Sequence, residues 1–338
     1  MKVLVTGGAG YIGSVLVPRL LKKGYEVTVI DRFFFGDSLD TNERLIKIKE
    51  DCRDLNISNF QDFDAVIDLV AISNDPSGEA FSEATYQINY QSRVNTAKLA
   101  KKAGVSRYIL PSSCSIYGFQ EEGFVADEGS KTNPLTVYAK ANEMAEKEIL
   151  PLSSNSFTTT VIRQATVYGY SRRMRFDLAI NGMTYGAWES RKLPLMRDGK
   201  QWRPMIHVKD TSDAMIFLLE TVPSKINGEI FNVGSKSNVY QLGKLAEKVA
   251  STIGSDIEIE WYGDKDTRSY NVSFEKIKKL GFAARYEAEY GVQEIISKLE
   301  SGELKKTTKT ITLEWYELLT NWHKAILEVD KNGSLINR

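Results

Sequence analysis

The chain has 338 residues, enough for a large core and a smaller second lobe, since domains commonly hold roughly 100 to 200 residues. Lysine plus arginine equals aspartate plus glutamate at 44 each, which disfavours a nucleic-acid-binding protein. Only two cysteines occur, no run reaches the roughly 18 apolar residues of a membrane helix, and no signal-peptide pattern precedes the first strand-like run. We therefore expect a cytoplasmic protein that binds neither nucleic acid nor membrane.

Strand-like apolar runs alternate with helix-like stretches through the first half of the chain. The patterns predict strands at residues 2–6, 26–30, 65–70 and 107–113, and main helices at 11–23 and about 79–103. The alternation continues at residues 137–150, 157–169 and 229–235. Strand alternating with helix indicates parallel pairing through right-handed crossovers. The expected class is α/β, with a doubly wound parallel sheet.

The pattern becomes irregular after about residue 168, where glycine, proline and arginine are scattered through the sequence. We expect residues 1–168 to form the first domain, with strands returning to its sheet near residues 200–235. Residues 169–338 would form mainly a smaller C-terminal substrate-binding lobe. A terminal helix is expected at 313–329, packed on the surface with Trp322 among its packing residues.

A glycine-rich turn, VTGGAGYIGSVL, links the first strand to the first helix. Gly7, Gly10 and Gly13 allow the backbone to approach a pyrophosphate, which the positive end of the helix attracts. Asp31 follows 18 residues after Gly13, at the end of the second strand, where a carboxylate accepts from ribose hydroxyls. The motif predicts a dinucleotide site, and the carboxylate favours NAD because it would repel a 2′-phosphate. Arg32 leaves NADP open as the alternative.

Further motifs follow the glycine turn in a specific order: DCRD, DLVAIS, QINY, PSSCSIYG, RQATVYG, RPMIHVKD and DTRSY. With them the chain resembles the extended short-chain dehydrogenase/reductases, in particular the NAD-dependent nucleotide-sugar epimerases and dehydratases related to UDP-galactose 4-epimerase. The resemblance spans nearly the whole chain. It implies a Rossmann-type sheet, bound NAD, a nucleotide-diphosphate sugar as partner, and a homodimer that pairs the helix near 79–103 and the Tyr138 helix with their symmetry mates.

The resemblance also assigns contacts along the cofactor. Tyr11 and Ile12 would contact the dinucleotide in the glycine turn, Asp51 and Cys52 would lie beside the adenine, Leu69, Val70 and Ala71 would lie along its length, and Gln164 and Ala165 would border the nicotinamide. Asn89 would lie in the long helix beneath the active site. Tyr138 and Asn142 would complete the cofactor-binding set.

Tyr138 occupies the position of the family's catalytic tyrosine, whose phenolate takes the proton of a sugar hydroxyl. An unperturbed tyrosine has a pKa of about 10, so only on the order of one in a thousand is ionised at neutral pH. The family places a lysine four residues later to assist ionisation, but here that position is Asn142. Lys140 cannot replace it, because position i+2 points to the opposite side of a helix. Asn142 can hydrogen-bond the cofactor's ribose but carries no charge.

The motif PSSCSIYG places Ser113 where the family has the serine or threonine that hydrogen-bonds the reacting hydroxyl and relays its proton. Cys114 and Ser115 follow, at positions where the related 4,6-dehydratases carry Asp and Glu. Neither side chain replaces a carboxylate in the elimination of water, so a 4,6-dehydratase is disfavoured. Ser115 is expected to contact the substrate.

Arg203 and Arg268 lie where the family holds the nucleotide's diphosphate, whose oxygens a guanidinium can bind in a bidentate manner. One arginine of SRRMRFDL is expected to contact the substrate, with Arg175 as the candidate, and Thr166 falls at a substrate-facing position. Only two histidines occur, 116 residues apart, and no Cys/His cluster accompanies them, so no metal site is predicted.

The sequence thus predicts an NAD-dependent nucleotide-sugar 4-epimerase that oxidises C4 transiently and returns the hydride to the other face. One alternative is a 4-dehydrogenase or ketoreductase. Another is a catalytically impaired protein that binds NAD and nucleotide sugar, because Asn142 replaces the usual lysine. Within the enzyme hypothesis, the asparagine indicates either a slower or differently tuned enzyme or a substitution made to trap a complex. The nucleotide and the sugar stay open.

Overall fold

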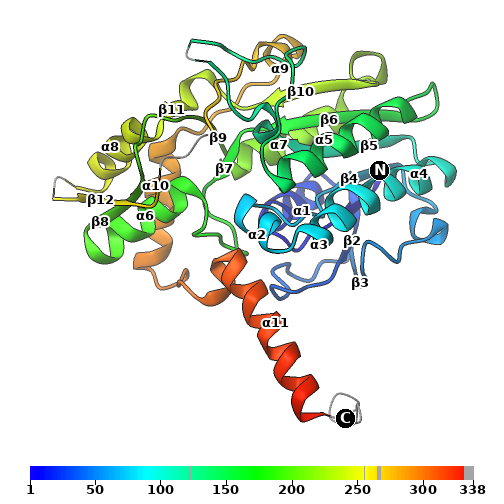
Figure 1. Cartoon of the computed structure of the whole chain (residues 1–338). Coiled ribbons are helices and arrows are strands. Elements are labelled where there is room, and N and C mark those ends of the chain that lie inside the picture. Colours follow the sequence, from blue (N-terminus) through cyan, green and yellow to red (C-terminus); the bar gives the residue numbers. More distant parts are fainter. Residues whose placement is uncertain (122, 255, 265–267, 331–338) are drawn as a thin grey trace.

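The computed structural model describes residues 1–121, 123–254, 256–264 and 268–330. Its centre is a parallel seven-stranded sheet in the order β10-β6-β5-β4-β1-β2-β3. Helices α1 (Gly13–Lys22) and α7 (Val208–Glu220) pack on one face, and α4 (Arg93–Lys102) and α5 (Val137–Ile149) on the other (Figure 1). The predicted α/β class with a doubly wound, Rossmann-type sheet is confirmed.

The strands of this sheet are β1 (Lys2–Thr6), β2 (Glu26–Asp31), β3 (Leu45–Lys49), β4 (Ala65–Asp68), β5 (Arg107–Ser113), β6 (Thr158–Gln164) and β10 (Glu229–Val233). Successive side chains of a strand point to opposite faces, so Val3 and Val5 pack with α1 while Leu4 packs with α4 and α5. The sequence analysis missed β3. It is an edge strand whose Ile46 and Ile48 are exposed, so it lacks a buried apolar pattern.

The long helix expected at about 79–103 is present as a continuous helical stretch over residues 82–102, which begins after Phe81 and contains π-helical turns. Residues 75–102 comprise α2 (Asp75–Ala80), α3 (Ser82–Thr85), the π-helical η2 (Tyr86–Ser92) and α4. Asn74 caps α2 by accepting from the Ser77 N–H, and Phe81 has non-helical dihedrals that separate α2 from α3. The π-helical turns of η2 pack beside α5.

The second lobe contains two small sheets. One joins β7 (Thr166–Tyr168), β9 (Trp202–His207) and β11 (Val239–Gln241), and the other joins β8 (Lys192–Met196) and β12 (Glu258–Tyr262). Helices α6 (Ala179–Ser190), α8 (Leu242–Ile253) and α10 (Ala288–Glu300) enclose its own apolar core, and α9 (Glu275–Leu280) packs on β10. Of the returning strands expected near 200–235, β10 joins the central sheet, whereas β9 belongs to the second lobe.

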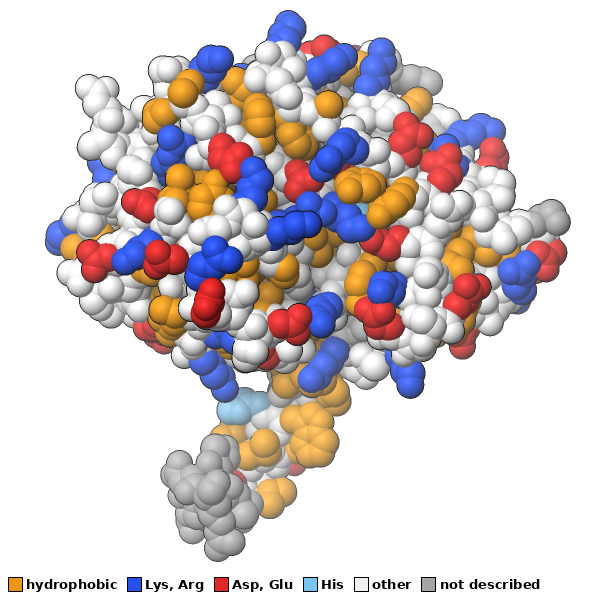
Figure 2. Space-filling view, turned by 180° about the vertical axis from the view of Figure 1, so that it is seen from behind, with side chains coloured by type: hydrophobic (Ala, Val, Ile, Leu, Met, Phe, Trp, Pro, Cys, Tyr) orange, Lys and Arg blue, Asp and Glu red, His pale blue; other side chains and the backbone are white. Residues whose placement is uncertain are grey.

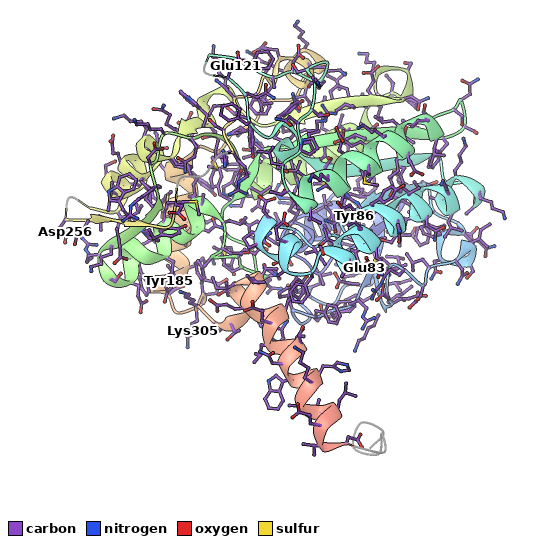
Figure 3. All side chains as sticks on the ribbon, viewed as in Figure 1. Glu83, Tyr86, Glu121, Tyr185, Asp256 and Lys305 are labelled. Carbon is purple, nitrogen blue, oxygen red and sulfur yellow. The ribbon has the colours of Figure 1, made fainter. Side chains whose placement is uncertain are left out.

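Short 3-10 helices connect these elements at η1 (Ile57–Phe60), η3 (Cys114–Tyr117), η4 (Leu150–Leu152), η5 (Pro223–Lys225), η6 (Lys236–Asn238) and η7 (Thr308–Thr310). The two lobes lie beside each other in Figure 3, where Tyr185 and Asp256 are labelled on the second lobe and Glu83 and Tyr86 on α3 and η2 of the first.

The terminal helix α11 (Thr312–Val329) projects from the body of the protein (Figure 1). Its beginning packs on the first lobe: the Trp315 Nε1–H donates to the Phe34 carbonyl at 2.8 Å, and the Tyr316 ring contacts Phe35 edge-on. Further along the helix Trp322 is 61% exposed, and Figure 2 shows hydrophobic side chains on the surface of the projecting part. The expectation that Trp322 packs was therefore wrong. Among the described residues, no helix has the length and apolarity to cross a membrane.

The start of α1 tolerates no side chain at Gly13, where a Cβ would lie 2.3 Å from the Gly8 carbonyl oxygen. We expect Gly13→Ala to lower the free energy of unfolding by roughly 1 to 3 kcal/mol, because the backbone of the turn must move. Gly129→Ala is the matched control, since its Cβ would meet only the Asp127 carboxylate at an ordinary 3.5 Å. Urea unfolding followed by circular dichroism measures both, and equal stabilities would contradict the tight turn.

Candidate active site

A cavity of about 520 Å³ lies at the carboxyl ends of the central strands, and residues of the second lobe form part of its wall. Strand order reverses at β1, between β2 and β4, and open parallel sheets bind ligands at such a point. The cavity brings together most predicted site residues: Gly7, Gly10, Tyr11, Ile12, Gly13, Asp31, Arg32, Asp51, Cys52, Leu69, Val70, Ala71, Ser113, Ser115, Tyr138, Gln164, Ala165, Thr166, Arg175, Arg203 and Arg268. Asn89 and Asn142 lie outside its lining.

The glycine turn runs tightly against the segment that follows β4. Gly7 has a φ of +68°, its N–H donates to the Ile30 carbonyl at 2.8 Å, and a Cβ there would lie 2.8 Å from the Val70 nitrogen. Helix α1 begins at Gly13, so the positive end of its dipole lies at the cavity wall. Bare backbone beside a helix N-terminus is suited to a pyrophosphate.

Asp31, at the end of β2, joins the glycine turn to the next loop. Its carboxylate accepts from the Ala9 N–H at 3.0 Å and from the Phe33 N–H at 2.7 Å. Burial raises the pKa of Asp31, and these backbone donors oppose that shift. The carboxylate lines the cavity, where its remaining lone pairs can accept from hydroxyl groups.

Arg32 pairs with Asp51 across the adjacent part of the wall, with Nη1 2.8 Å from Oδ2. Arg53 also binds this carboxylate, and its hydrogen bonds are the largest cause of the low Asp51 pKa of about 2. Burial raises the pKa of the neighbouring Cys52 to about 12, so that thiol stays protonated at neutral pH. Arg32 is thus engaged by a carboxylate at the position where a 2′-phosphate would need it.

Asn89 holds the cavity wall from behind. Its Oδ1 accepts from the Ile72 N–H at 2.8 Å and its Nδ2 donates to the Ile72 carbonyl at 2.9 Å. The side chain is fully buried and both ends of its amide are occupied. The structure therefore places Asn89 beneath the active site, as expected, but as a support of the loop after β4 and without direct access to the cavity.

Tyr138 stands in the first turn of α5 and faces the cavity. Thr136 caps this helix through the Ala139 N–H, and its hydroxyl donates to Asp75 at 2.6 Å. The Tyr138 hydroxyl is hydrogen-bonded to the Ser113 side chain at the end of β5. Burial is the largest cause of the raised pKa of Tyr138, and the nearby Asp75 carboxylate raises it further. The predicted catalytic pair Tyr138 and Ser113 is thus in contact.

Asn142 lies one turn further along α5, with its amide turned away from the cavity. Its Nδ2 donates to the Tyr138 carbonyl at 2.9 Å, and its Oδ1 accepts from Arg93 Nη1 at 2.9 Å. The predicted hydrogen bond from Asn142 to the cofactor's ribose therefore does not fit this geometry. Asn142 connects Tyr138 to a buried arginine that the sequence analysis did not single out.

The predicted diphosphate arginines line the cavity and hold each other in place. Arg203 donates to the Trp202 carbonyl at 2.9 Å and also to the Arg268 carbonyl, and its guanidinium lies over the Tyr270 ring. Arg268 forms an ion pair with Asp75. The hydrogen bond from Arg203 to the Arg268 carbonyl joins β9 to the segment before α9, so the two arginines lie at the same part of the cavity wall.

Arg175 is buried and fully engaged. It forms a bidentate pair with Asp177, at 3.0 and 2.7 Å, and its Nη1 donates to the Ser73 hydroxyl at 2.9 Å. These contacts fix the start of the second lobe to the loop after β4. To contact a substrate as predicted, Arg175 would have to share its N–H donors between the substrate and its present partners Asp177 and Ser73.

Further residues line the cavity wall, among them Arg173, one of the arginines of SRRMRFDL, and Tyr316, which the sequence analysis did not single out. Arg173 is buried, its guanidinium lies 3.6 Å from the centre of the Phe35 ring, and it donates to the Thr312 hydroxyl at 3.1 Å. Burial is the largest cause of its low pKa of about 10. Tyr316 of α11 also lines the cavity. No local signal marks Tyr316, since only the return of α11 to the first lobe brings it there.

The two residues after Ser113 have different surroundings. Cys114 is buried, its thiol donates to the Arg163 carbonyl at 3.1 Å, and burial raises its pKa, so it is a packing residue. Ser115 lines the cavity, and within the described part of the chain its buried hydroxyl has no hydrogen-bond partner. A buried hydroxyl without a partner is suited to contact a polar ligand.

The part of the chain that the structure describes contains no group of three or more His, Cys, Asp or Glu side chains that could hold a metal ion. His207 instead accepts from the Lys209 N–H at 3.2 Å and pairs with Glu294 at 3.1 Å. It supports the start of α7.

Comparison with known proteins agrees with this geometry. The profile of the NAD dependent epimerase/dehydratase family matches residues 3–234, more than half of the chain. The chain belongs to this family. It is 27% identical to a UDP-N-acetyl-alpha-D-glucosaminuronate decarboxylase of Bacillus cytotoxicus, covering 83% of this chain and 86% of that protein. It is 28% identical to UDP-arabinose 4-epimerase 1 of Arabidopsis thaliana, covering 77% and 69% of the two chains.

Solved structures of family members share the fold. The UDP-glucuronic acid 4-epimerase from Bacillus cereus, in complex with UDP-glucuronic acid and NAD, superposes with a TM-score of 0.78 at 24% identity, covering 89% of this chain and 99% of that one. DesIV, a dTDP-glucose 4,6-dehydratase from Streptomyces venezuelae with NAD bound, superposes with a TM-score of 0.80 at 23% identity, covering 90% and 98%.

NAD is the cofactor of this family, and the expectation of NAD is confirmed. The cavity fits it in two respects. The glycine turn leaves backbone and a helix N-terminus for the pyrophosphate, and Asp31 presents a carboxylate for the adenosine ribose. Asp31 would repel the 2′-phosphate of NADP, and Arg32 could offset this repulsion only if its guanidinium left Asp51.

We expect Asp31→Asn to weaken NAD binding by roughly tenfold to a hundredfold, because a hydrogen bond to a charged group contributes about 1.5 to 3 kcal/mol. Binding of NADP should weaken less, since the substitution also removes a charge that repels the 2′-phosphate. Isothermal titration calorimetry with both dinucleotides measures this, with Asp256→Asn, on the exposed side of the second lobe, as control. An unchanged NAD dissociation constant would remove Asp31 from the site.

Proposed function

We propose that the protein is an NAD-dependent nucleotide-sugar 4-epimerase acting through a transient 4-keto intermediate. The contact between Tyr138 and Ser113 inside the shared cavity carries the proposal. This contact supports the proposal because a phenol and a hydroxyl that can act as proton acceptor and relay line the same space as the glycine turn and the arginines Arg203 and Arg268. A dinucleotide and a sugar diphosphate can therefore lie there together.

The chemistry divides between cofactor and protein. NAD, when bound, accepts a hydride from the sugar carbon and supplies it again. The protein moves the proton: Ser113 hydrogen-bonds the reacting hydroxyl, and Tyr138 takes its proton and gives it back when the carbonyl is reduced. Hydride and proton both return, so the reaction is balanced without an external oxidant. Change of configuration requires the keto-sugar to present its other face before the hydride returns.

The surroundings of the cavity disfavour loss of water from the sugar. Such an elimination needs an acid for the leaving hydroxyl and a base for the carbon-bound proton, and the positions after Ser113 hold a buried thiol and a hydroxyl. Asp75, the carboxylate that raises the pKa of Tyr138, already accepts from the Thr136 hydroxyl and forms an ion pair with Arg268. Epimerisation needs only the tyrosine and serine that are present.

Asn142 supports a second candidate, a protein that binds NAD and nucleotide sugar with little turnover. Its amide supplies no charge to stabilise a phenolate, and the raised pKa of Tyr138 works in the same direction. A third candidate, a 4-dehydrogenase or ketoreductase, would use the same residues and differ in exchanging hydride with an external partner. Product analysis separates the three.

The decisive experiment incubates the purified protein with UDP-, GDP-, dTDP- and CDP-sugars without added cofactor and identifies products by NMR. We expect one substrate to yield its 4-epimer. A rise in reduced-nicotinamide absorbance equal to the substrate consumed would indicate the dehydrogenase, and bound but unchanged sugar would indicate the binding protein.

Tyr138→Phe should lower kcat for this epimerisation by roughly a hundredfold to ten-thousandfold, the range that general acid–base groups contribute. NAD should still bind, because only one hydroxyl is lost. Tyr185→Phe on the second lobe is the control, since its hydroxyl contacts the exposed Glu189. Activity should rise with pH, because only the ionised phenol accepts a proton and the pKa of Tyr138 lies above its ordinary value.

The expected homodimer stays a prediction. It would bury the outer faces of η2, α4 and α5. Met144 on α5 is 36% exposed, and Tyr90 on η2 donates to Glu148 on α5. Sedimentation equilibrium would decide the oligomeric state.

A further inference from the structure

The missing lysine is the least expected feature of the catalytic helix, and the structure shows another cation close by. Arg93, the first residue of α4, is 1% exposed and lies between the carboxyl ends of β4 and β5 and helix α5. Its Nη1 donates to Asn142 Oδ1 at 2.9 Å. Asn142 in turn donates to the carbonyl of Tyr138 at 2.9 Å. The side chain at position i+4 therefore links the catalytic tyrosine to a guanidinium from a different helix.

The other contacts of Arg93 fix it at the functional edge of the sheet. Its Nη2 donates to the carbonyls of Asp68 at 2.9 Å and Pro111 at 2.5 Å. Leu69 and Ser113, which follow these two positions in the chain, line the cavity. Arg93 itself is outside the lining, so it stands directly behind the wall from which Tyr138 and Ser113 act.

Arg93 has one buried carboxylate partner, and the two groups form a long ion pair without a direct hydrogen bond. Its nearest carboxylate, Asp68, lies 3.8 Å from Nε, and the two oxygens of Asp68 also accept from the hydroxyls of Thr6 and Tyr108. Nε has no hydrogen-bond partner among the residues that the structure describes. A guanidinium stays protonated even when buried, whereas a lysine can lose its proton there.

A second buried arginine in the same core shows the usual arrangement. Arg163 forms a close pair with Glu146, with Nη2 2.7 Å and Nε 3.1 Å from Oε2. Its charge is neutralised within a few ångströms. The close acceptors of Arg93 are instead backbone carbonyls and an amide, which carry no charge, and its carboxylate partner Asp68 lies further away at 3.8 Å. The contrast indicates a use for the charge beyond packing.

We propose that Arg93 is a positioning residue that replaces the absent lysine, supplying a permanent positive charge behind Tyr138, and that Asn142 seats its guanidinium. The proposal rests on the proposed function and explains how α5 can work with an amide at this position. A lysine at 142 would compete with Arg93 for the same space and place two cations together.

The electrostatic surroundings of Tyr138 agree in direction. Burial raises the pKa of Tyr138, as does Asp75 on α2, whereas Arg93 lowers it, together with the Ser113 hydroxyl and Arg175. Arg175 is held by Asp177, so part of its charge is neutralised. Removing Arg93 should therefore raise the pKa of Tyr138.

The test moves the charge between the two helices. We compare the wild type with Arg93→Gln, Arg93→Lys, Asn142→Lys and the double variant Arg93→Gln/Asn142→Lys. Fluorotyrosine incorporated at position 138, which titrates at lower pH than tyrosine, allows fluorine NMR to follow this phenol alone in the full chain with NAD. The pH profile of kcat for the epimerised sugar is the second readout, and thermal unfolding verifies that each variant is folded.

Arg93→Gln should raise the pKa of residue 138 by about one unit or more, as expected for loss of a nearby opposite charge. The rising limb of kcat should move to higher pH by a similar amount. Arg93→Lys should preserve most of the wild-type titration. Asn142→Lys alone should lower thermal stability, and the double variant should return both the titration and the rising limb toward the wild type.

An unchanged titration in folded Arg93→Gln would overturn the proposal, and so would a gain in activity from Asn142→Lys with Arg93 in place. If Arg93→Gln does not fold, the Arg93→Lys and double variants decide in the same way, since both retain a cation. If no nucleotide sugar is epimerised, the proposed function fails while the NMR titration still tests Arg93. If epimerisation occurs and the titration does not move, only the role of Arg93 fails.

Discussion

A buried guanidinium must find acceptors, and in this protein that requirement connects the elements that form the active site. Arg93 reaches the ends of β4 and β5 and the amide on α5 from the first turn of α4. Removing one partner from a buried polar network of this kind lowers the free energy of unfolding by more than an average hydrogen bond contributes, because a buried charge is left without a partner. The relative placement of Tyr138 and Ser113 depends on this one side chain.

The second lobe completes the cavity by leaving the central sheet. The chain passes from β6 to β7 between Gln164 and Thr166, so the two residues that flank Ala165 lie where the two sheets diverge. Arg175 and Asp177 hold this lobe to the loop after β4, and α11 returns to contact the loop after β2 through Trp315. The cofactor end of the cavity is therefore enclosed by segments from both ends of the chain.

The fold is shared by enzymes whose names describe decarboxylation, epimerisation and dehydration, so the sheet alone does not determine the reaction. The reaction depends instead on the side chains around the site, here those beside and behind Tyr138. In this protein they are a buried thiol at 114, a hydroxyl at 115 without a partner among the described residues, and an amide at 142 that contacts a guanidinium. These residues define how this site can differ from its relatives.

The sequence by itself determined the features that depend on local spacing. The glycine turn and Asp31 at the end of the next strand follow from strand, turn and helix geometry, whereas Tyr138 and the missing lysine were identified through the family resemblance. The structure has Gly7 and Asp31 at the cavity wall and Tyr138 and Asn142 one turn apart on α5. Alternation of apolar segments likewise predicted the parallel sheet, because each strand buried on both faces leaves a strong apolar signal. The exposed edge strand β3 leaves no such signal and was missed.

Only the tertiary structure decided the contacts between residues far apart in the chain. Arg93 and Asn142 are separated by 49 positions, and no periodic pattern indicates that an arginine on one helix takes the place of a lysine on another. The ion pair between Arg32 and Asp51 and the ion pair between Arg175 and Asp177 were likewise not predicted, although all four residues line the cavity. The projection of α11 is of the same kind, since a helical pattern predicts an apolar stripe and cannot say which surface covers it.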